Sequence, residues 1–171
     1  MRADTLINRD LFIAFKKSLF LLHKSAEHTV VKDTDLTLAQ LDVLMTVYAL
    51  GTTSQQLVAE MLQNTQASVS RQVSILLRKK LISRTQNLKN KREYTLVPTT
   101  LGIDCARASM NILDVHFEKV FSVVPRDERK KMTRHFQSVM KHIKSIQGAD
   151  PKIFARMELC EKTMKENLKK L

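Results

Sequence analysis

Apolar residues in segment 54–77 recur at helical spacing in two short stretches. Ser54 precedes the first stretch and Thr65 the second, and both residue types favour the N-cap position of a helix. Only residues 63–65 separate the stretches, which is typical of a turn between crossed helices. The pattern therefore predicts a helix-turn-helix. Its apolar positions are Leu57, Val58, Met61 and Leu62 in the first helix and Val69, Val73, Leu76 and Leu77 in the second.

A strand-like pattern follows the second helix. Residues 81–85 and 94–97 are rich in residues that favour strands, and they flank a basic segment at 87–92. Thr99 then opens another helix. Apolar helical spacing is core patterning whatever the function, and a basic loop is common, so neither part is informative alone. Their order predicts a winged helix-turn-helix, in a fold that is mainly α with a small β-wing.

The outer face of the second helix suits the major groove of DNA, because its small and hydroxyl side chains permit close approach and still offer hydrogen bonds to base edges. This face comprises Gln66, Ala67, Ser70, Arg71, Ser74 and Arg78. A long cation at the hairpin tip can enter the minor groove or bind a phosphate. We expect phosphate neutralisation by Arg71, Arg78, Lys79, Arg84, Lys89, Lys91 and Arg92.

The rest of the chain reads as helices. We expect one at about 5–27, a polar connection at 29–35, and a helix from Thr37 to Gly51, with Gly51 in a left-handed conformation. Further helices are expected after Thr99, Pro125 and Pro151, with apolar residues at steps of three and four. Such steps describe helices that pack on one another. The predicted organisation is an N-terminal dimerisation helix and linker (1–36), a winged domain (37–98) and C-terminal dimerisation helices with an extra last helix (99–171); a self-contained bundle is the alternative.

The charge is concentrated in two segments. The net charge is +12, and residues 64–97 hold eight Lys and Arg against one acidic residue. This first block coincides with the proposed reading helix and wing, as contact with phosphates requires. Residues 126–171 hold thirteen against six, which fits either a solvated helical face or a secondary DNA contact. Aromatic residues make up only 5%, with no Trp, which argues against base-stacking modules for single strands.

Other chemistry finds little support in the sequence. There is no signal-peptide pattern, no apolar run long enough for a membrane span, and no disulfide framework from Cys105 and Cys160, so we expect a cytoplasmic protein. No catalytic motif is present, and we expect no enzyme activity and no cofactor. The histidines form no pair at helical ligand spacing, so no metal site is expected; they are His23, His28, His116, His135 and His142.

Several segments resemble the MarR/SlyA family of bacterial winged-helix regulators. Residues 37–44 (TLAQLDVL) are similar to its L-T-x-x-Q-x-x-V-L opening, and residues 58–60 (VAE) to its L-A-E. Residues 67–71 (ASVSR) are similar to its S-T-V-S-R recognition segment, and residues 81–84 (LISR) to its G-L-V-x-R strand. The wing signature D-x-R, followed by L-T-x-x-G, is matched by residues 90–92 (NKR) and 99–102 (TTLG).

The resemblance implies a homodimer built by the terminal helices. It places Ser68, Ser70 and Arg71 near bases or phosphates and Arg92 in the minor groove. Two positions depart from the family pattern. Asn90 replaces the wing Asp and cannot supply its charge. Lys80 replaces the usual Gly after the recognition helix, and a left-handed Lys would cost about 1 kcal/mol, so this helix is expected to end differently.

The resemblance also implies a small-molecule effector between the dimerisation helices and the winged domain. The candidate pocket residues are His23, Met45, Tyr48 and Cys105, each of which has a simple core role as its alternative. The peroxide-sensing branch uses a Cys in the first helix, and this chain has none before Cys105. On its apolar stripe, Cys105 reads as a buried, inert thiol.

These observations predict a homodimeric, sequence-specific regulator of transcription that binds double-stranded DNA, acts as a repressor and occupies a pseudopalindromic operator. Two-fold symmetry would place the reading helices about one DNA turn, roughly 34–36 Å, apart. A non-specific architectural DNA binder and a winged-helix protein-interaction adaptor are the alternatives. The clustered charge at 64–97 argues against the adaptor.

Overall fold

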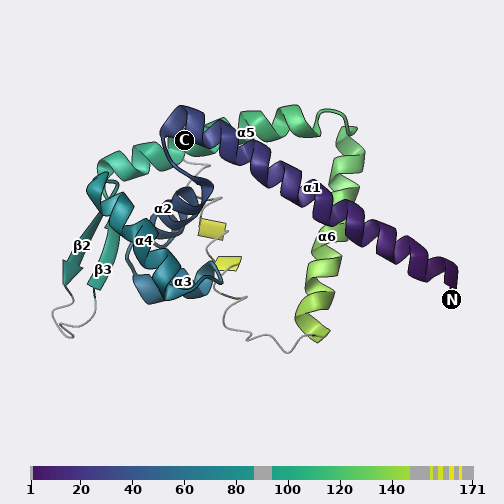
Figure 1. Ribbon diagram of the computed structural model, residues 1–171, viewed down its shortest axis with the longest axis horizontal. Coiled ribbons are helices and arrows are strands. Elements are labelled where there is room, and N and C mark those ends of the chain that lie inside the picture. Colours follow the sequence, from purple (N-terminus) through teal and green to yellow (C-terminus); the bar gives the residue numbers. More distant parts are fainter. Residues whose placement is uncertain are drawn as a thin grey trace.

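The computed structural model describes residues 2–86 and 94–146, together with residues 155, 158, 159, 162, 163 and 166. Those isolated positions are helical. The described helices and strands follow the order α1 (Arg2–Thr34), α2 (Leu38–Leu50), β1 (Thr53–Ser54), α3 (Gln55–Met61), α4 (Gln66–Arg78), β2 (Ile82–Gln86), β3 (Tyr94–Pro98), α5 (Thr100–Phe121) and α6 (Arg126–Ile146). The predicted fold class, mainly α with a small β-wing, is confirmed (Figure 1).

The main core of the winged domain draws more buried residues from α2 than from any other element. Leu41, Leu44 and Val47 of α2 are buried, as are Val69 and Leu76 on the inner face of α4. Thr37 caps α2 in a capping box with Gln40, which fixes where this helix begins. Gly51 ends it with a φ of 69° and a ψ of −55°, so φ is positive as expected but the conformation is not the left-handed helical one.

The sheet is antiparallel, with strand order β1-β3-β2. Thr53 pairs with Leu96, and Arg84 pairs with Leu96 from the other side. The sequence did not reveal β1, because it has only two residues and Ser54 also serves as the N-cap of α3. The wing is therefore anchored at its base to the start of the helix-turn-helix.

The expected polar connection at residues 29–35 is wrong, because α1 continues to Thr34. Ala26 and Val30 are buried at helical spacing, so this last part of α1 packs on the core despite its polar composition. His116 of α5 lies between two hydroxyls of the same stretch, with Nε2 3.0 Å from Ser25 Oγ and Nδ1 3.2 Å from Thr29 Oγ1. Tertiary contact thus extends the helix beyond the end that composition suggested.

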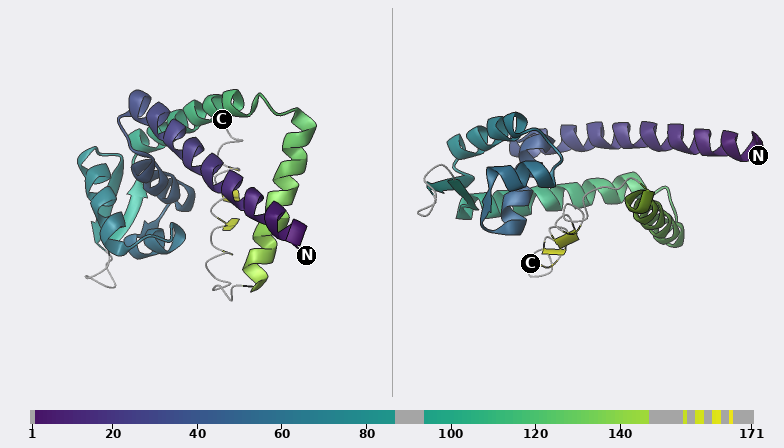
Figure 2. Two further views of the ribbon diagram at one scale, coloured as in Figure 1. Left: turned by 45° about the vertical axis from the view of Figure 1, so that its right-hand side comes forward. Right: turned by 90° about the horizontal axis from the view of Figure 1, so that it is seen from below.

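The helices α1 and α5 lie side by side and extend away from the winged domain, and α6 leaves the far end of α5 at a steep angle to it (Figures 1 and 2). Phe15 of α1 contacts Phe136 of α6 with ring centroids 5.3 Å apart. Much of the apolar surface on these helices is nevertheless exposed in the single chain. On α1 it includes Leu6, Ile7, Leu11, Phe12, Phe15, Leu19, Phe20 and Leu21, and on α6 Met132, Phe136, Val139, Met140 and Ile143.

The apolar seam predicted after Thr99 is confirmed along most of α5. Ala106 is fully buried, and Ile103, Met110, Leu113 and Phe117 pack against the core. Most of the expected helix after Pro151 lies outside the described residues, and so does Cys160. Within the described parts of the chain, no helix combines the length and the hydrophobicity that crossing a membrane would require.

Candidate nucleic-acid interface

The helix-turn-helix is built from local capping contacts. Ser54 Oγ accepts from the Leu57 backbone N–H at 3.1 Å, and Thr65 Oγ1 accepts from that of Ser68 at 3.2 Å. Between α3 and α4, Gln63 adopts a positive φ of 51°, and the Asn64 N–H donates to the Ala59 carbonyl oxygen at 3.0 Å. The predicted caps and the predicted turn are therefore confirmed, and they fix the direction in which α4 leaves the turn.

The outer face of α4 carries the side chains that the sequence assigned to it. Gln66, Ala67, Arg71, Ser74 and Arg78 are exposed, whereas Ser68 and Ser70 are half-buried. A shallow hollow of about 520 Å³ runs along this face, lined by Ala67, Ser70, Arg71, Ser74, Ile75 and Arg78.

Within this face the Ser74 hydroxyl donates to the Ser70 carbonyl oxygen at 2.9 Å. That bond uses the only proton of the hydroxyl, so the Ser74 oxygen is left to accept from a donor outside. The outer face of α4 thus combines small side chains with a hydroxyl oxygen and the guanidinium groups of Arg71 and Arg78.

Arg84 at the base of the wing is stacked on an aromatic ring. Its guanidinium carbon lies 3.4 Å from the ring centroid of Tyr94, a cation–π contact between β2 and β3. The stack holds the plane of the guanidinium and leaves its edge free for a bidentate acceptor such as phosphate. Sequence reasoning missed Tyr94 as the partner of Arg84; the signal available was an aromatic residue on the return strand of the predicted hairpin, diagonal to a cation.

Three predicted contacts at the tip of the wing, Lys89, Lys91 and Arg92, lie outside the described residues, as does Asn90. Their roles stay predictions from the sequence. The described part of the candidate interface therefore consists of the outer face of α4 and Arg84 at the base of the wing.

The structure differs from expectation at the end of α4. Lys80 adopts the left-handed conformation, with a φ of 58°, so the expectation of a different helix end is wrong. The Leu81 N–H donates to the Leu76 carbonyl oxygen at 3.0 Å, and this contact holds the turn despite the missing Gly. Lys79, expected to neutralise a phosphate, forms an ion pair with Asp35, with Nζ 2.6 Å from Oδ2.

The candidate effector residues do not surround one described cavity. Met45 and Tyr48 are buried in the core, and Cys105 packs against that core half-buried. His23 is exposed on α1, where its Nε2 lies 3.5 Å from a Glu27 carboxylate oxygen. Burial raises the pKa of the Cys105 thiol, which keeps it protonated at neutral pH. Among the described residues, no group of three or more His, Cys, Asp or Glu is arranged to hold a metal ion.

Comparison with known proteins identifies the domain. The sequence model of the MarR family matches residues 36–94, which span the segment from the start of α2 to the start of β3. The chain carries a MarR-family winged helix-turn-helix domain. The family resemblance drawn from the sequence is thus confirmed. No curated protein matches the chain at a significant level of sequence similarity.

Solved structures share the fold across most of the chain, beyond the MarR-family domain itself. The ligand-free organohalide-sensing transcriptional regulator RdhR aligns with a TM-score of 0.71 at 17% identity, covering 84% of each chain. Its 2,4-dichlorophenol-bound form aligns at 0.69 with 17% identity and 80% of each chain. MepR of S. aureus in complex with DNA aligns at 0.64 with 23% identity, over 77% of this chain and 96% of that one. Wild-type MarR of E. coli aligns at 0.65 with 18% identity, over 77% and 94%.

Proposed function

We propose that this protein is a homodimeric regulator of transcription that reads a specific sequence in double-stranded DNA and acts as a repressor. The observation that carries the proposal is the outer face of α4, where small and hydroxyl side chains lie beside the exposed Arg71 and Arg78. Such a face fits a major groove and offers donors to base edges. The MarR-family domain at residues 36–94 and the fold shared with MepR, whose structure holds DNA, support the same function.

Affinity and specificity come from different residues in this proposal. Arg78 and Arg84, with Lys89, Lys91 and Arg92 of the wing, supply phosphate contacts that do not depend on sequence. The front of α4, from Gln66 to Arg71, discriminates between bases. Arg92 adds discrimination where the wing enters the minor groove.

The proposed homodimer covers the exposed apolar surface of α1 and α6. Phe12 and Phe20 of α1 are 65% and 61% exposed, and Val139 and Met140 of α6 are 52% and 54% exposed. Contiguous apolar surface of this kind marks an interaction site, and a second copy of the chain offers matching helices. This is the region that the terminal apolar seams assigned to dimerisation.

A small-molecule effector is part of the proposal. The RdhR structures, one ligand-free and one with 2,4-dichlorophenol, show that a protein of this fold binds a small molecule. In this chain His23 and Cys105 lie on α1 and α5, which lead from the winged domain to the proposed dimer region, and Met45 and Tyr48 lie on α2 of the winged domain. A ligand that enters here would have to separate packed core residues.

Two alternative functions predict different binding behaviour. A non-specific architectural protein would bind every duplex with similar affinity and a strong salt dependence. A protein-interaction adaptor would bind no duplex. Neither alternative explains why small residues of α4 face outward beside the guanidinium groups of Arg71 and Arg78.

Selection from a random pool of duplexes tests the proposal, with the full chain immobilised and bound DNA sequenced over several rounds. The proposal predicts enrichment of a two-fold-symmetric sequence with half-sites about one DNA turn apart. Sedimentation velocity tests the dimer in parallel. Phe12→Glu is expected to give monomers, and Lys17→Glu on the same helix is the control for added negative charge. A pool that stays random would reject sequence-specific reading.

A further inference from the structure

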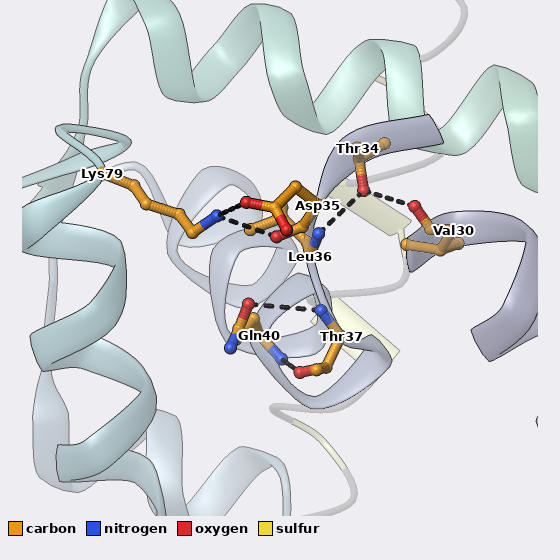
Figure 3. A network of polar contacts seen from close by, with 7 residues as sticks. All are labelled: Val30, Thr34, Asp35, Leu36, Thr37, Gln40 and Lys79. Atoms are coloured by element: carbon orange, nitrogen blue, oxygen red, sulfur yellow. Dashed lines mark hydrogen bonds and ion pairs between the residues drawn. The ribbon is translucent and has the colours of Figure 1, made fainter. Parts of the chain in front are cut away.

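The corner between α1 and α2 is held by a closed set of hydrogen bonds (Figure 3). The Thr34 hydroxyl donates to the Val30 carbonyl oxygen at 2.7 Å and accepts from the Leu36 N–H at 3.3 Å. The next contact is reciprocal: the Thr37 N–H donates to Gln40 Oε1, and the Gln40 N–H donates to Thr37 Oγ1, each at 3.2 Å. With Leu36 fully buried between these contacts, the corner is a fixed point of the fold.

Lys79, the C-cap residue of α4, is bonded to this corner. Its Nζ donates to Asp35 Oδ2 at 2.6 Å and to the Asp35 carbonyl oxygen at 2.8 Å (Figure 3). Asp35 has a φ of 55°, a conformation that Asp tolerates better than most residues. Forty-four positions separate the two residues in sequence, so the contact joins the end of the recognition helix directly to the end of α1.

The same end of α4 is held from α5. Thr99, the N-cap of α5, donates from its hydroxyl to the Lys80 carbonyl oxygen at 2.7 Å and from its N–H to the Leu81 carbonyl oxygen at 3.1 Å. Gly102 allows this approach, because a Cβ built there would lie 1.8 Å from the Leu81 carbonyl oxygen. The recognition helix is thus attached to α1 by one ion pair and to α5 by backbone contact.

We propose that Asp35 and Lys79 are positioning residues for DNA recognition, whose contact fixes the end of α4 against α1 and thereby sets the half-site spacing that the dimer accepts. The inference rests on the proposed function, because α1 and α5 lead from the winged domain to the proposed dimer region. Core packing through Val69 and Leu76 holds the inner face of α4, and the backbone contact with α5 holds one side of its C-terminal end. The contact of Lys79 with Asp35 holds the same end from the side of α1.

The competing role for Lys79 is the phosphate contact expected from the sequence. A phosphate would have to compete with a carboxylate already bonded to Nζ. The hydrogen bond from Lys79 and its charge hold the pKa of the Asp35 carboxyl below the ordinary value, so the carboxylate stays charged wherever DNA binding is measured. The two roles predict different results for Asp35→Asn. If Lys79 is a phosphate contact, its release from Asp35 increases the affinity for DNA. If Lys79 is a positioning residue, its release weakens the preference for one half-site spacing.

The contact can be removed without opening the core. The Asp35 side chain is 93% exposed and that of Lys79 32% exposed, so neither Asp35→Asn nor Lys79→Met leaves a buried cavity. Asp33→Asn on the last turn of α1 and Lys80→Met next to Lys79 are matched controls that remove the same charges elsewhere. Lys79→Arg keeps the charge and enough donors to reach both Asp35 oxygens.

The experiment uses the full chain and the duplex that the wild-type protein selects from a random pool. Versions of this duplex with the spacer lengthened or shortened by one base pair move the half-sites by about 3.4 Å and rotate them by roughly 35°. Affinities are measured by fluorescence anisotropy over a range of salt concentrations. Thermal unfolding of each variant confirms that it is folded.

The inference predicts that wild type, both controls and Lys79→Arg lose about tenfold in affinity for each altered spacer. Asp35→Asn and Lys79→Met are expected to lose less than about threefold in affinity for each altered spacer. The slope of log affinity against log salt concentration should be similar for Lys79→Met and Lys80→Met. A shallower slope for Lys79→Met than for Lys80→Met, tighter binding by Asp35→Asn, or an unchanged spacing preference in either variant would overturn it. A wild-type protein that selects no site would reject the proposed function itself.

Discussion

Gly102 gives the sharpest test of how the recognition helix is attached to α5. It lies in the first turn of α5, where a Gly-to-Ala change ordinarily stabilises a helix by about 1 kcal/mol. Here an added Cβ would lie 1.8 Å from the Leu81 carbonyl oxygen and 2.8 Å from the carbonyl carbon, both of them backbone atoms. Helix propensity therefore predicts that Gly102→Ala stabilises the protein, whereas packing predicts that it destabilises the protein.

The size of the expected stability change follows from the displacement of Leu81 that the added Cβ requires. Leu81 has to retreat by more than 1 Å, and its carbonyl oxygen accepts from the Thr99 N–H at 3.1 Å. The single Thr99 hydroxyl proton is shared between the Lys80 carbonyl oxygen at 2.7 Å and that of Leu81 at 3.1 Å. Overpacking costs about 1–3 kcal/mol, and weakening these bonds adds about 1–2 kcal/mol. After the gain in propensity is subtracted, Gly102→Ala should destabilise the protein by about 1–4 kcal/mol.

Gly51→Ala is the matched control, because a Cβ there meets nothing within 4 Å although φ is 69°. Only backbone strain opposes that change, so we expect a loss of about 1 kcal/mol. Urea unfolding at one fixed protein concentration measures both variants, since stability of a dimer depends on concentration. If Gly102→Ala is as stable as wild type or more stable, the close approach of α5 to the end of α4 is refuted.

Three further predictions concern the interface and the free thiol. Thr65→Ala should lower the free energy of unfolding by about 1 kcal/mol, because the Ser68 N–H loses its 3.2 Å acceptor; no change in urea unfolding would contradict the capping role. Arg71→Ala should reduce the preference for the selected duplex over a scrambled one, whereas Lys89→Ala should weaken both alike; equal losses in anisotropy titrations would refute this division. In a Cys160→Ser background, Cys105 should react with iodoacetamide more slowly than a free thiol until the pH is alkaline, because burial raises its pKa. Since the folded state favours the neutral thiol, its contribution to stability is present below the ordinary thiol pKa and is lost as pH rises through the folded-state value. Alkylation at the rate of the urea-unfolded chain would contradict burial.

Local chemistry explains which parts of the fold could be predicted. The caps at Ser54, Thr65 and Thr99 depend on residues at most three positions away, and each is found where the sequence placed it. The buried faces of α3 and α4 follow from spacing alone. The helix-turn-helix, including the outer face of α4, could therefore be predicted from these local features.

Tertiary contacts explain what could not be predicted. The end of α1 was set too early, because the burial of Val30 depends on packing that composition does not show. Lys80 takes a left-handed conformation because Thr99 holds its carbonyl oxygen. Lys79 and Asp35 are 44 positions apart, and the sequence around neither residue indicates that the two are paired. The sequence therefore predicted too many phosphate contacts, because Lys79 is paired with Asp35.

The most direct test of the central claim is a titration of the full chain, at about 0.15 M salt, with the selected duplex and with a scrambled duplex of equal length. The account predicts a preference of about a hundredfold or more for the selected duplex, with two protomers bound per site. Equal affinity for the two duplexes, or no binding to either, would contradict it.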